Sequence, residues 1–256
     1  SAVATMAPSP TPTASPAAGR AYVALGDSIT FGIGVPQPRR QGYPARVAER
    51  LAAATPPFDE LRVLAVPGET AAGFLEHRID DVETLIGELG ERVGLVTIGL
   101  GGNELLRTRR DPACIADAAG DACREVANAA AEDASAALDA VVGRVAVAVA
   151  SAGGEATILL LAYYNPDVEP IAVSTIVGSD GVIGCEAGDT APGLNDRIAC
   201  VAERHGVGLV DLYTAFLGRE DELTGIGDGD VHPNSAGYEV IAATIAGELG
   251  LPALGG

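Results

Sequence analysis

The fold is decided by the stretch Ala21-Tyr22-Val23-Ala24-Leu25-Gly26-Asp27-Ser28-Ile29-Thr30-Phe31-Gly32 near the start of the chain. The apolar run Tyr22 to Leu25 predicts a short buried strand, because turn residues follow it. Ser28 lies just beyond the carboxyl end of that strand, where catalytic groups gather in open α/β sheets. Ser28 is therefore a candidate nucleophile. Taken alone, Gly-Asp-Ser would better fit an ordinary turn, since turns prefer these residues.

Four further apolar runs predict strands, and amphipathic segments between them predict helices. Strands are expected at Leu61–Val66, Gly94–Leu100, Ala156–Tyr163 and Val207–Leu212, and helices at Gly42–Thr55, Asp80–Glu91, Arg124–Ala150 (with a break near Gly143), Ala191–His205 and from Asn234 or Ser235 to Leu249. The alternation predicts a five-stranded parallel sheet with helices on both faces, a doubly wound α/β domain. The segments 114–123 and 221–232 are expected to be loops.

The chain has 256 residues, and its composition divides it into two parts. Residues 1–19 are rich in Ala, Pro, Ser and Thr without apolar periodicity, which predicts a flexible linker. Such a linker is typical of the stalk that follows a removed signal or lipid anchor, and a plain disordered tail is the alternative. No intact signal peptide is recognisable. Residues 20–256 are expected to form a single domain.

The formal net charge is −19, and all 16 basic residues are arginines. Phosphate binding needs clustered Lys or Arg, so this balance argues against a nucleic-acid partner and disfavours anionic membranes. It is compatible with a small-molecule, lipid or sugar ester as substrate. No apolar run approaches the roughly 18 residues of a membrane helix, so no transmembrane segment is expected. We expect a monomer.

The four cysteines form two close pairs in sequence, Cys114 with Cys123 and Cys185 with Cys200. Three connectivities are possible, and pairing neighbours is the simplest, since each bond then closes a short loop. No CxxC motif and no neighbouring His completes a zinc signature. Two loop disulfides would indicate an oxidising, exported location. The alternative is four reduced, buried thiols in a cytosolic protein.

The turns after the first three predicted strands carry Ser28, Gly68 and Asn103, and parallel strands bring such turns to one edge. A serine nucleophile needs a base near neutral pKa, and the chain has three histidines. His77 lies in a charged stretch, which favours the surface. His205 ends a predicted helix, where a structural role is favoured. His232 lies in a polar segment before the last helix and is the best candidate base.

These residues make the chain similar to the SGNH hydrolases, also called the GDSL esterase/lipase family. Gly26-Asp27-Ser28-Ile29-Thr30 resembles the block that carries the nucleophile, and Gly68 stands at the second-block glycine. Gly101-Gly102-Asn103-Glu104 resembles the third block, Gly-x-Asn-Asp, with Glu104 in place of Asp. His232-Pro233-Asn234 resembles the last block. The resemblance covers residues 20–249 and implies this family's three-layer fold.

The resemblance also implies a catalytic acid, but the usual Asp-x-x-His places Gly229 where the acid should stand. Pro233 favours an extended conformation for His232, and residues two apart then share a face, which favours Asp230. A helical turn would instead favour Asp228. A backbone carbonyl behind His232, giving a dyad, is the third option. Two aspartates without further ligands do not predict a calcium site.

The resemblance implies hydrolysis of acyl esters through an acyl-enzyme on Ser28, with His232 as base and no metal or organic cofactor. The oxyanion would be held by the backbone N–H groups of Ser28 and Gly68 and by the Asn103 amide. A carbohydrate O-acetyl esterase or acyltransferase with the same site is the alternative, and a non-catalytic surface-binding domain is a more distant one. The substrate pocket is expected at Tyr163, Tyr164 and Asn165, with residues 168–192 as its wall or lid.

Overall fold

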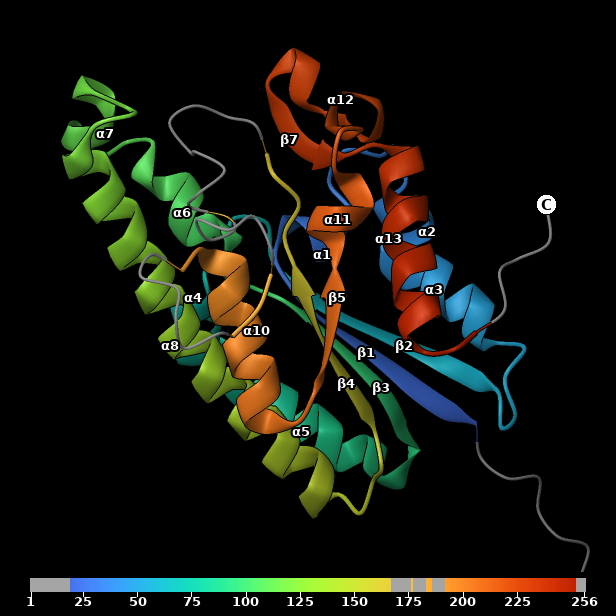
Figure 1. The fold of residues 1–256 in the computed structure, drawn as a ribbon. Coiled ribbons are helices and arrows are strands. Elements are labelled where there is room, and N and C mark those ends of the chain that lie inside the picture. Colours follow the sequence, from blue (N-terminus) through green and yellow to red (C-terminus); the bar gives the residue numbers. More distant parts are fainter. Residues whose placement is uncertain (1–18, 167–175, 177–182, 186–191, 252–256) are drawn as a thin grey trace, which may run out of the picture.

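A computed structural model describes residues 19–166, 176, 183–185 and 192–251, and its centre is a five-stranded parallel sheet. The strands are β1 (Arg20–Gly26), β2 (Phe58–Ala65), β3 (Val93–Gly99), β4 (Thr157–Ala162) and β5 (Gly208–Asp211), in the order β2-β1-β3-β4-β5 (Figure 1). The predicted doubly wound sheet is confirmed. Nearly all of the predicted linker and most of the predicted lid lie outside the described residues.

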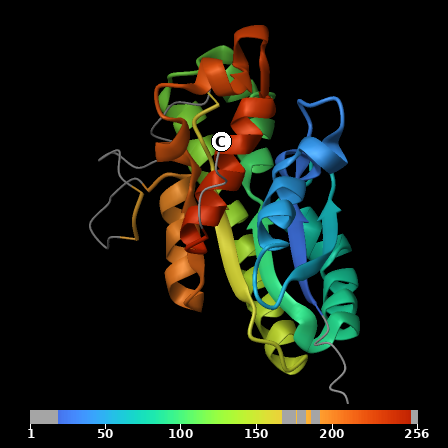
Figure 2. The same ribbon diagram turned by 90° about the vertical axis from the view of Figure 1, so that its right-hand side faces the viewer.

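Helices cover both faces of the sheet, as Figures 1 and 2 show. One face packs against α4 (Ala71–His77), α5 (Ile79–Leu89), α8 (Asp121–Ser151) and α10 (Leu194–His205), and the other packs against α3 (Tyr43–Leu51), α11 (Leu212–Phe216) and α13 (Ser235–Glu248). Alternate residues of β1 supply the two cores, with Val23 and Leu25 on one side and Tyr22 and Ala24 on the other. This is the period of two that a strand buried on both faces must have.

The remaining elements are short and lie between these layers. They are α1 (Ser28–Phe31), α2 (Pro38–Gln41), η1 (Gly90–Arg92), α6 (Gly102–Thr108), α7 (Pro112–Ala116), α12 (Glu220–Leu223), β6 (Thr224–Gly225), η2 (Ile226–Asp228) and β7 (Asp230–Pro233). Since the chain passes from β1 to β2 on one side and then to β3 on the other, the order reverses at β1. Ligands bind at such a switch point, beyond the carboxyl ends of the strands.

The predicted break near Gly143 is wrong, because α8 continues without interruption from Asp121 to Ser151. Its buried alanines and valines pack along the helical layer, which offsets the roughly 1 kcal/mol that an internal glycine costs. Gly143 has a packing role, since a Cβ atom there would lie 3.3 Å from Cε1 of His205. The small residue thus lets α10 approach α8.

By length and composition alone, α8 could cross a membrane, with a mean hydropathy of 1.5 over its most apolar window. The sequence pattern did not single out this segment. Within the fold, 39% of that window is buried, and the buried side contacts α4, α5, α6 and α10. A core helix of a water-soluble protein gives the same signal, so the finding is weak evidence for a membrane span.

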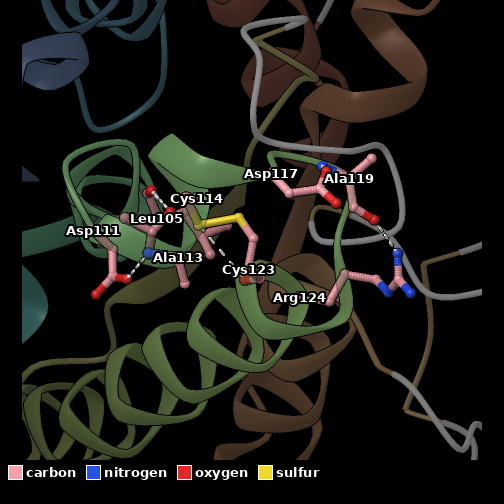
Figure 3. Close-up of a disulfide and its surroundings, with 9 residues drawn as sticks. Leu105, Asp111, Ala113, Cys114, Asp117, Ala119, Cys123 and Arg124 are labelled. Carbon is pink, nitrogen blue, oxygen red and sulfur yellow. Dashed lines mark hydrogen bonds between the residues drawn. A yellow bond between two sulfur atoms is a disulfide. The ribbon is translucent and has the colours of Figure 1, made fainter.

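The prediction of a loop over residues 114–123 is only partly confirmed, because both ends of this segment are helical and residues 117–120 alone form a loop. Asp111 caps α7 by accepting the Ala113 N–H at 2.9 Å, and Pro112 supplies a favourable first helical residue. Cys114 in α7 and Cys123 in α8 form a disulfide, drawn in Figure 3, and each is only 3% exposed. The bond therefore joins two helices in the interior, and a second disulfide joins Cys185 to Cys200 of α10.

The predicted loop over residues 221–232 contains α12, β6, η2 and β7 instead. Strands β6 and β7 form a two-stranded antiparallel sheet, which the sequence pattern did not predict. Leu223 of α12 is fully buried. The Asn234 side chain donates to the carbonyl of Glu222 at 2.7 Å. Asn234 also caps α13, accepting from the N–H groups of Ala236 and Gly237. These bonds hold the segment that carries His232 against the last helix.

Candidate active site

Ser28 is the first residue of α1, directly after the turn that ends β1. Asp27 caps this helix by accepting the Ile29 N–H at 2.9 Å. The turn is tight: a Cβ atom on Gly26 would lie 2.5 Å from the carbonyl oxygen of Gly99 on β3. Only glycine allows β1 and β3 to approach this closely, so the Gly-Asp-Ser sequence holds the hydroxyl of Ser28 at the edge of the sheet.

His232 lies on β7 and reaches Ser28 across 204 residues of sequence. Its Nε2 is 2.9 Å from Oγ of Ser28, and its Nδ1 is 2.5 Å from Oδ1 of Asp230. A carboxylate can only accept, so Nδ1 carries the proton and Nε2 is free to accept the serine hydroxyl. The three side chains form a continuous hydrogen-bonded chain.

Asp230 is the carboxylate that the fold brings to His232. Its Oδ1 also accepts the backbone N–H of His232 at 3.1 Å. Burial raises the pKa of Asp230, but the bonds from the backbone and ring of His232 outweigh this, so the pKa is lowered. Asp228 ends the 3-10 turn η2 and is exposed, and the αL residue Gly229 (φ 79°) separates it from β7.

Asn103 and Gly68 stand on the two turns next to Ser28. Asn103 is in the first turn of α6, after β3, and its Nδ2 donates to the Glu69 carbonyl at 2.8 Å and to Oδ2 of Asp27 at 3.3 Å. Gly68 has a φ of 79°, which favours glycine, and lies in the turn between β2 and α4. The bond from Asn103 to Glu69 fixes these two turns to each other.

Asp27 is a buried carboxyl group behind the site, which the sequence pattern indicated only as part of the turn. Its Oδ2 accepts the hydroxyl of Tyr163 at 3.0 Å as well as the Asn103 amide. Burial raises the pKa of Asp27 to about 6, although the bonds from Ile29 and Tyr163 and the nearby His232 oppose the shift. No sequence motif predicted this contact, because Tyr163 follows β4, 136 residues away.

Glu104 supports the neighbouring turn. Its Oε1 accepts the backbone N–H of Ala71 at 2.7 Å, at the start of α4, and burial raises the pKa of the carboxyl group. The carboxyl group thus bonds to α4 rather than to Ser28. Glutamate therefore fits at the position where the family has aspartate.

An apolar pocket of about 40 Å³ opens beside Ser28. Tyr163 and Tyr164 line it, whereas Asn165 is not among its lining residues. Tyr164 stacks on Phe216 with ring centroids 4.4 Å apart, and its hydroxyl donates to the Val231 carbonyl at 2.5 Å. The other lining residues are mostly aliphatic, among them Ile29, Leu105, Leu106, Ile176, Leu194 and Val231.

The other two histidines lie elsewhere. His77 is exposed at the end of α4, as predicted. The Nε2 of His205 is 2.9 Å from Oδ1 of Asp139, a contact between α10 and α8. Within the described ranges, no group of three His, Cys, Asp or Glu residues is arranged to hold a metal ion.

Three solved structures show what this chain is similar to. An alpha/beta hydrolase enzyme from the metagenome of Lake Arreo, Spain, is 25% identical with a TM-score of 0.56, and the match covers 91% of this chain and 96% of that one. An acetylxylan esterase from Geobacillus stearothermophilus (18%, TM-score 0.59, covering 91% and 95%) and an extracellular lipase from Streptomyces rimosus (20%, TM-score 0.58, covering 90% and 100%) share the fold. A search of the curated proteins finds no match.

The fold is that of an α/β hydrolase, and a match to a family model defines the class as a hydrolase that acts on ester bonds. The sequence model of the GDSL-like Lipase/Acylhydrolase family matches residues 24–240, which is most of the chain. The protein belongs to this family.

Proposed function

We propose that the protein is a serine esterase that forms an acyl-enzyme on Ser28. The hydrogen bond of 2.9 Å between Ser28 Oγ and His232 Nε2 carries this proposal. His232 takes the hydroxyl proton as Oγ attacks the ester carbonyl, and then gives that proton to the departing alcohol. Water, deprotonated by His232, cleaves the acyl-enzyme and restores Ser28.

The oxyanion of each tetrahedral intermediate is held, in this proposal, by three donors. They are the N–H groups of Ser28 and Gly68 and the side-chain amide of Asn103. Ser28 begins a helix, where backbone N–H groups have no intrahelical acceptor. One hydrogen of the Asn103 amide is bound to Glu69, and the other makes only the longer 3.3 Å bond to Asp27. The weaker bond leaves that hydrogen available to a negatively charged oxygen.

We further propose that Asp230 orients His232 and stabilises the imidazolium form. Support comes from the 2.5 Å bond to Nδ1 and from the backbone N–H of His232, which bonds to the same carboxylate oxygen. Asp228 ends η2 before the αL residue Gly229, whereas Asp230 lies on β7 together with His232, which supports this choice of acid.

The small pocket favours a short acyl group. A water molecule needs roughly 10–15 Å³ of such space, so about 40 Å³ holds only a few heavy atoms. An acetyl group fits this size, and a long fatty acyl chain does not. The same observation supports the second candidate, removal of O-acetyl groups from carbohydrate, which is the chemistry named for the Geobacillus relative in fold.

We place the protein outside the reducing cytoplasm. One disulfide joins α7 to α8 and a second joins Cys185 to α10, and such bonds persist in oxidising compartments. The related lipase from Streptomyces rimosus is described as extracellular, which agrees with this placement.

Hydrolysis of p-nitrophenyl esters of increasing chain length tests the proposal. We expect acetate and butyrate to be cleaved faster than octanoate, and the Ser28→Ala variant to lose at least about 10³-fold in kcat. The exposed Ser151 at the end of α8 provides a matched control, since Ser151→Ala should retain full activity. Undiminished hydrolysis by Ser28→Ala would refute the mechanism, and equal rates on octanoate would refute the short-acyl assignment.

A further inference from the structure

A second cavity borders the proposed reacting groups and adjoins the apolar pocket. It is an open groove of about 680 Å³. Its walls are the end of α6 with the residues after it, and the segment Gly229 to His232. Asn103 and His232 line both the groove and the apolar pocket. An ester bound across this junction therefore has one half in each cavity.

The wall formed by α6 carries three arginines in four positions, Arg107, Arg109 and Arg110, and all three are exposed. Arg107 Nη2 donates to the Gly68 carbonyl at 2.9 Å, so its guanidinium lies over the turn beside Ser28. Nine of the 16 arginines form ion pairs elsewhere in the fold. Within the described part of the chain, none of these three does.

The acidic groups around the groove are occupied by other partners. Asp230, the one carboxylate among the described lining residues, is bonded to His232. Asp111 caps α7, and Glu104 accepts from the start of α4. Three arginines against one aspartate among the described lining residues leave the groove locally positive, although the chain as a whole carries a net charge of −19.

Such an arrangement is suited to binding an anion. Three like charges in four positions repel one another, and Glu104, whose carboxylate interacts with Arg107, offsets only part of this charge. A groove lined by one sign of charge concentrates ligands of the opposite sign. The planar guanidinium group pairs with carboxylate or phosphate through two parallel hydrogen bonds, which gives both affinity and orientation.

We propose that the alcohol half of the natural ester carries a carboxylate or phosphate group, which binds Arg109 and Arg110. The acyl half then occupies the apolar pocket, the ester carbonyl faces Ser28, and the leaving oxygen faces His232. This inference rests on the proposed esterase function and adds the chemical class of the alcohol. The net charge of the chain argues against a nucleic-acid partner, whereas the local charge at the groove favours a small anionic ester.

A matched pair of soluble acetate esters tests the inference. One is 4-acetoxybenzoate, whose alcohol carries a carboxylate, and the other is its neutral methyl ester. The measured quantity is the ratio of kcat/KM for the anionic ester to kcat/KM for the neutral ester. The intrinsic reactivity of the two esters is the same for every variant, so it cancels when ratios are compared.

The variant is Arg109→Glu with Arg110→Glu, and the control is Arg39→Glu with Arg40→Glu. The control pair is adjacent and exposed on α2, lies outside the groove, and changes the net charge equally. At low ionic strength we expect the ratio to fall about tenfold or more in the groove variant, since each exposed pairing contributes up to a factor of roughly five. The control should keep the wild-type ratio. Added salt should lower the wild-type ratio, because the contacts are exposed.

An unchanged ratio in the groove variant, or an equal fall in the control, overturns the inference. A role in binding a lipid surface would also overturn it. In that case wild type would sediment with phosphatidylglycerol vesicles, the groove variant would not, and the ratio of kcat/KM values would be the same in both proteins. Failure of the esterase proposal is distinguishable, since neither ester would then be cleaved.

Calorimetric binding of 4-hydroxybenzoate, the alcohol product, tests the groove without turnover. Loss of binding in the groove variant alone supports the inference, and equal binding refutes it.

Discussion

Asp230 reaches His232 while about half of its side chain remains in water, being 49% exposed. Such exposure weakens its electrostatic effect on the imidazolium, because solvent screens the pair. The geometric effect remains, because the bond to Nδ1 fixes the ring with Nε2 toward Ser28. The proposed contribution of Asp230 is therefore largely one of orientation.

Replacing Asp230 by Asn tests this role. We expect kcat to fall by about 100-fold, less than the roughly 10⁴-fold seen where such an aspartate is fully buried. Asp228→Asn, two residues away and exposed, should retain wild-type kcat. The measurement is kcat for p-nitrophenyl acetate at pH 8. Loss with Asp228→Asn instead would reassign the acid, and no loss in either variant would indicate a Ser28–His232 dyad.

A second prediction for a single residue concerns Asp27 and the dependence of protein stability on pH. Its pKa is about 6 in the folded protein, against 3.8 for the unperturbed group. The folded state therefore binds more protons than the unfolded state between these values, so stability falls as the pH rises through this window. The difference corresponds to about 3 kcal/mol. This contribution is fully present below about pH 4 and is lost above about pH 6.

The Asp27→Asn variant does not titrate, so it should not show this loss. We expect the free energy of unfolding of Asp27→Asn, relative to wild type, to rise by up to about 3 kcal/mol between pH 4 and pH 7. Urea denaturation of both proteins at several pH values measures it, and other titrating groups cancel in the comparison. A constant difference across this range would show that the pKa of Asp27 is ordinary.

At the scale of elements, the position of His232 depends on contact between the β6–β7 segment and α13. The contact is made at Gly237, in the first turn of α13. A Cβ atom there would lie 2.1 Å from the Leu223 carbonyl oxygen and 2.9 Å from Cβ of Pro233, the residue after the histidine. Neither neighbour is the end of a flexible side chain, so either the helix or the segment must shift.

Gly237→Ala should therefore affect both stability and catalysis. We expect a loss of about 1–3 kcal/mol in the free energy of unfolding from overpacking, and a fall of about 10- to 100-fold in kcat from displacement of His232. On the same helix, a Cβ atom added at Gly247 would have nothing within 4 Å among the described residues, so Gly247→Ala should be neutral or slightly stabilising. Full activity and stability in Gly237→Ala would show that the segment does not depend on this packing.

The elements also show how far sequence alone can predict this fold. Strands β1, β3 and β4 are buried apolar runs, so hydrophobic pattern locates them. The edge strand β2 has no buried residue, and its charged first half, Phe58 to Glu60, lies before the predicted start at Leu61. Strand β6 has two residues and η2 has three, which is too short for any periodicity to be visible. The continuation of α8 through Gly143 was also not predictable. It depends on packing against α10, and the sequence around Gly143 carries no information about that contact.

At the scale of the whole molecule, some contacts of the candidate site could be predicted from the sequence and others could not. Ser28, Gly68 and Asn103 could be assigned to one edge because parallel topology brings successive turns together. Asp230 could be preferred to Asp228 because alternate residues of an extended segment share a face. The contact of Tyr163 with Asp27 could not be predicted, since it joins the end of β4 to the turn after β1 and has no local pattern. The arginine groove was missed because a net charge of −19 conceals a local cluster of the opposite sign.

The separation between Ser28 and His232 has a consequence for how the protein is made. A chain that leaves a ribosome or a translocation channel amino-terminus first presents Ser28, the proposed nucleophile, 204 residues before His232, the proposed base. His232 reaches Ser28 only once the last helix has docked, because α13 supports the segment that carries His232. Hydrolytic activity should thus switch on as the final step of synthesis or export, and its onset provides a direct signal that the entire chain has folded.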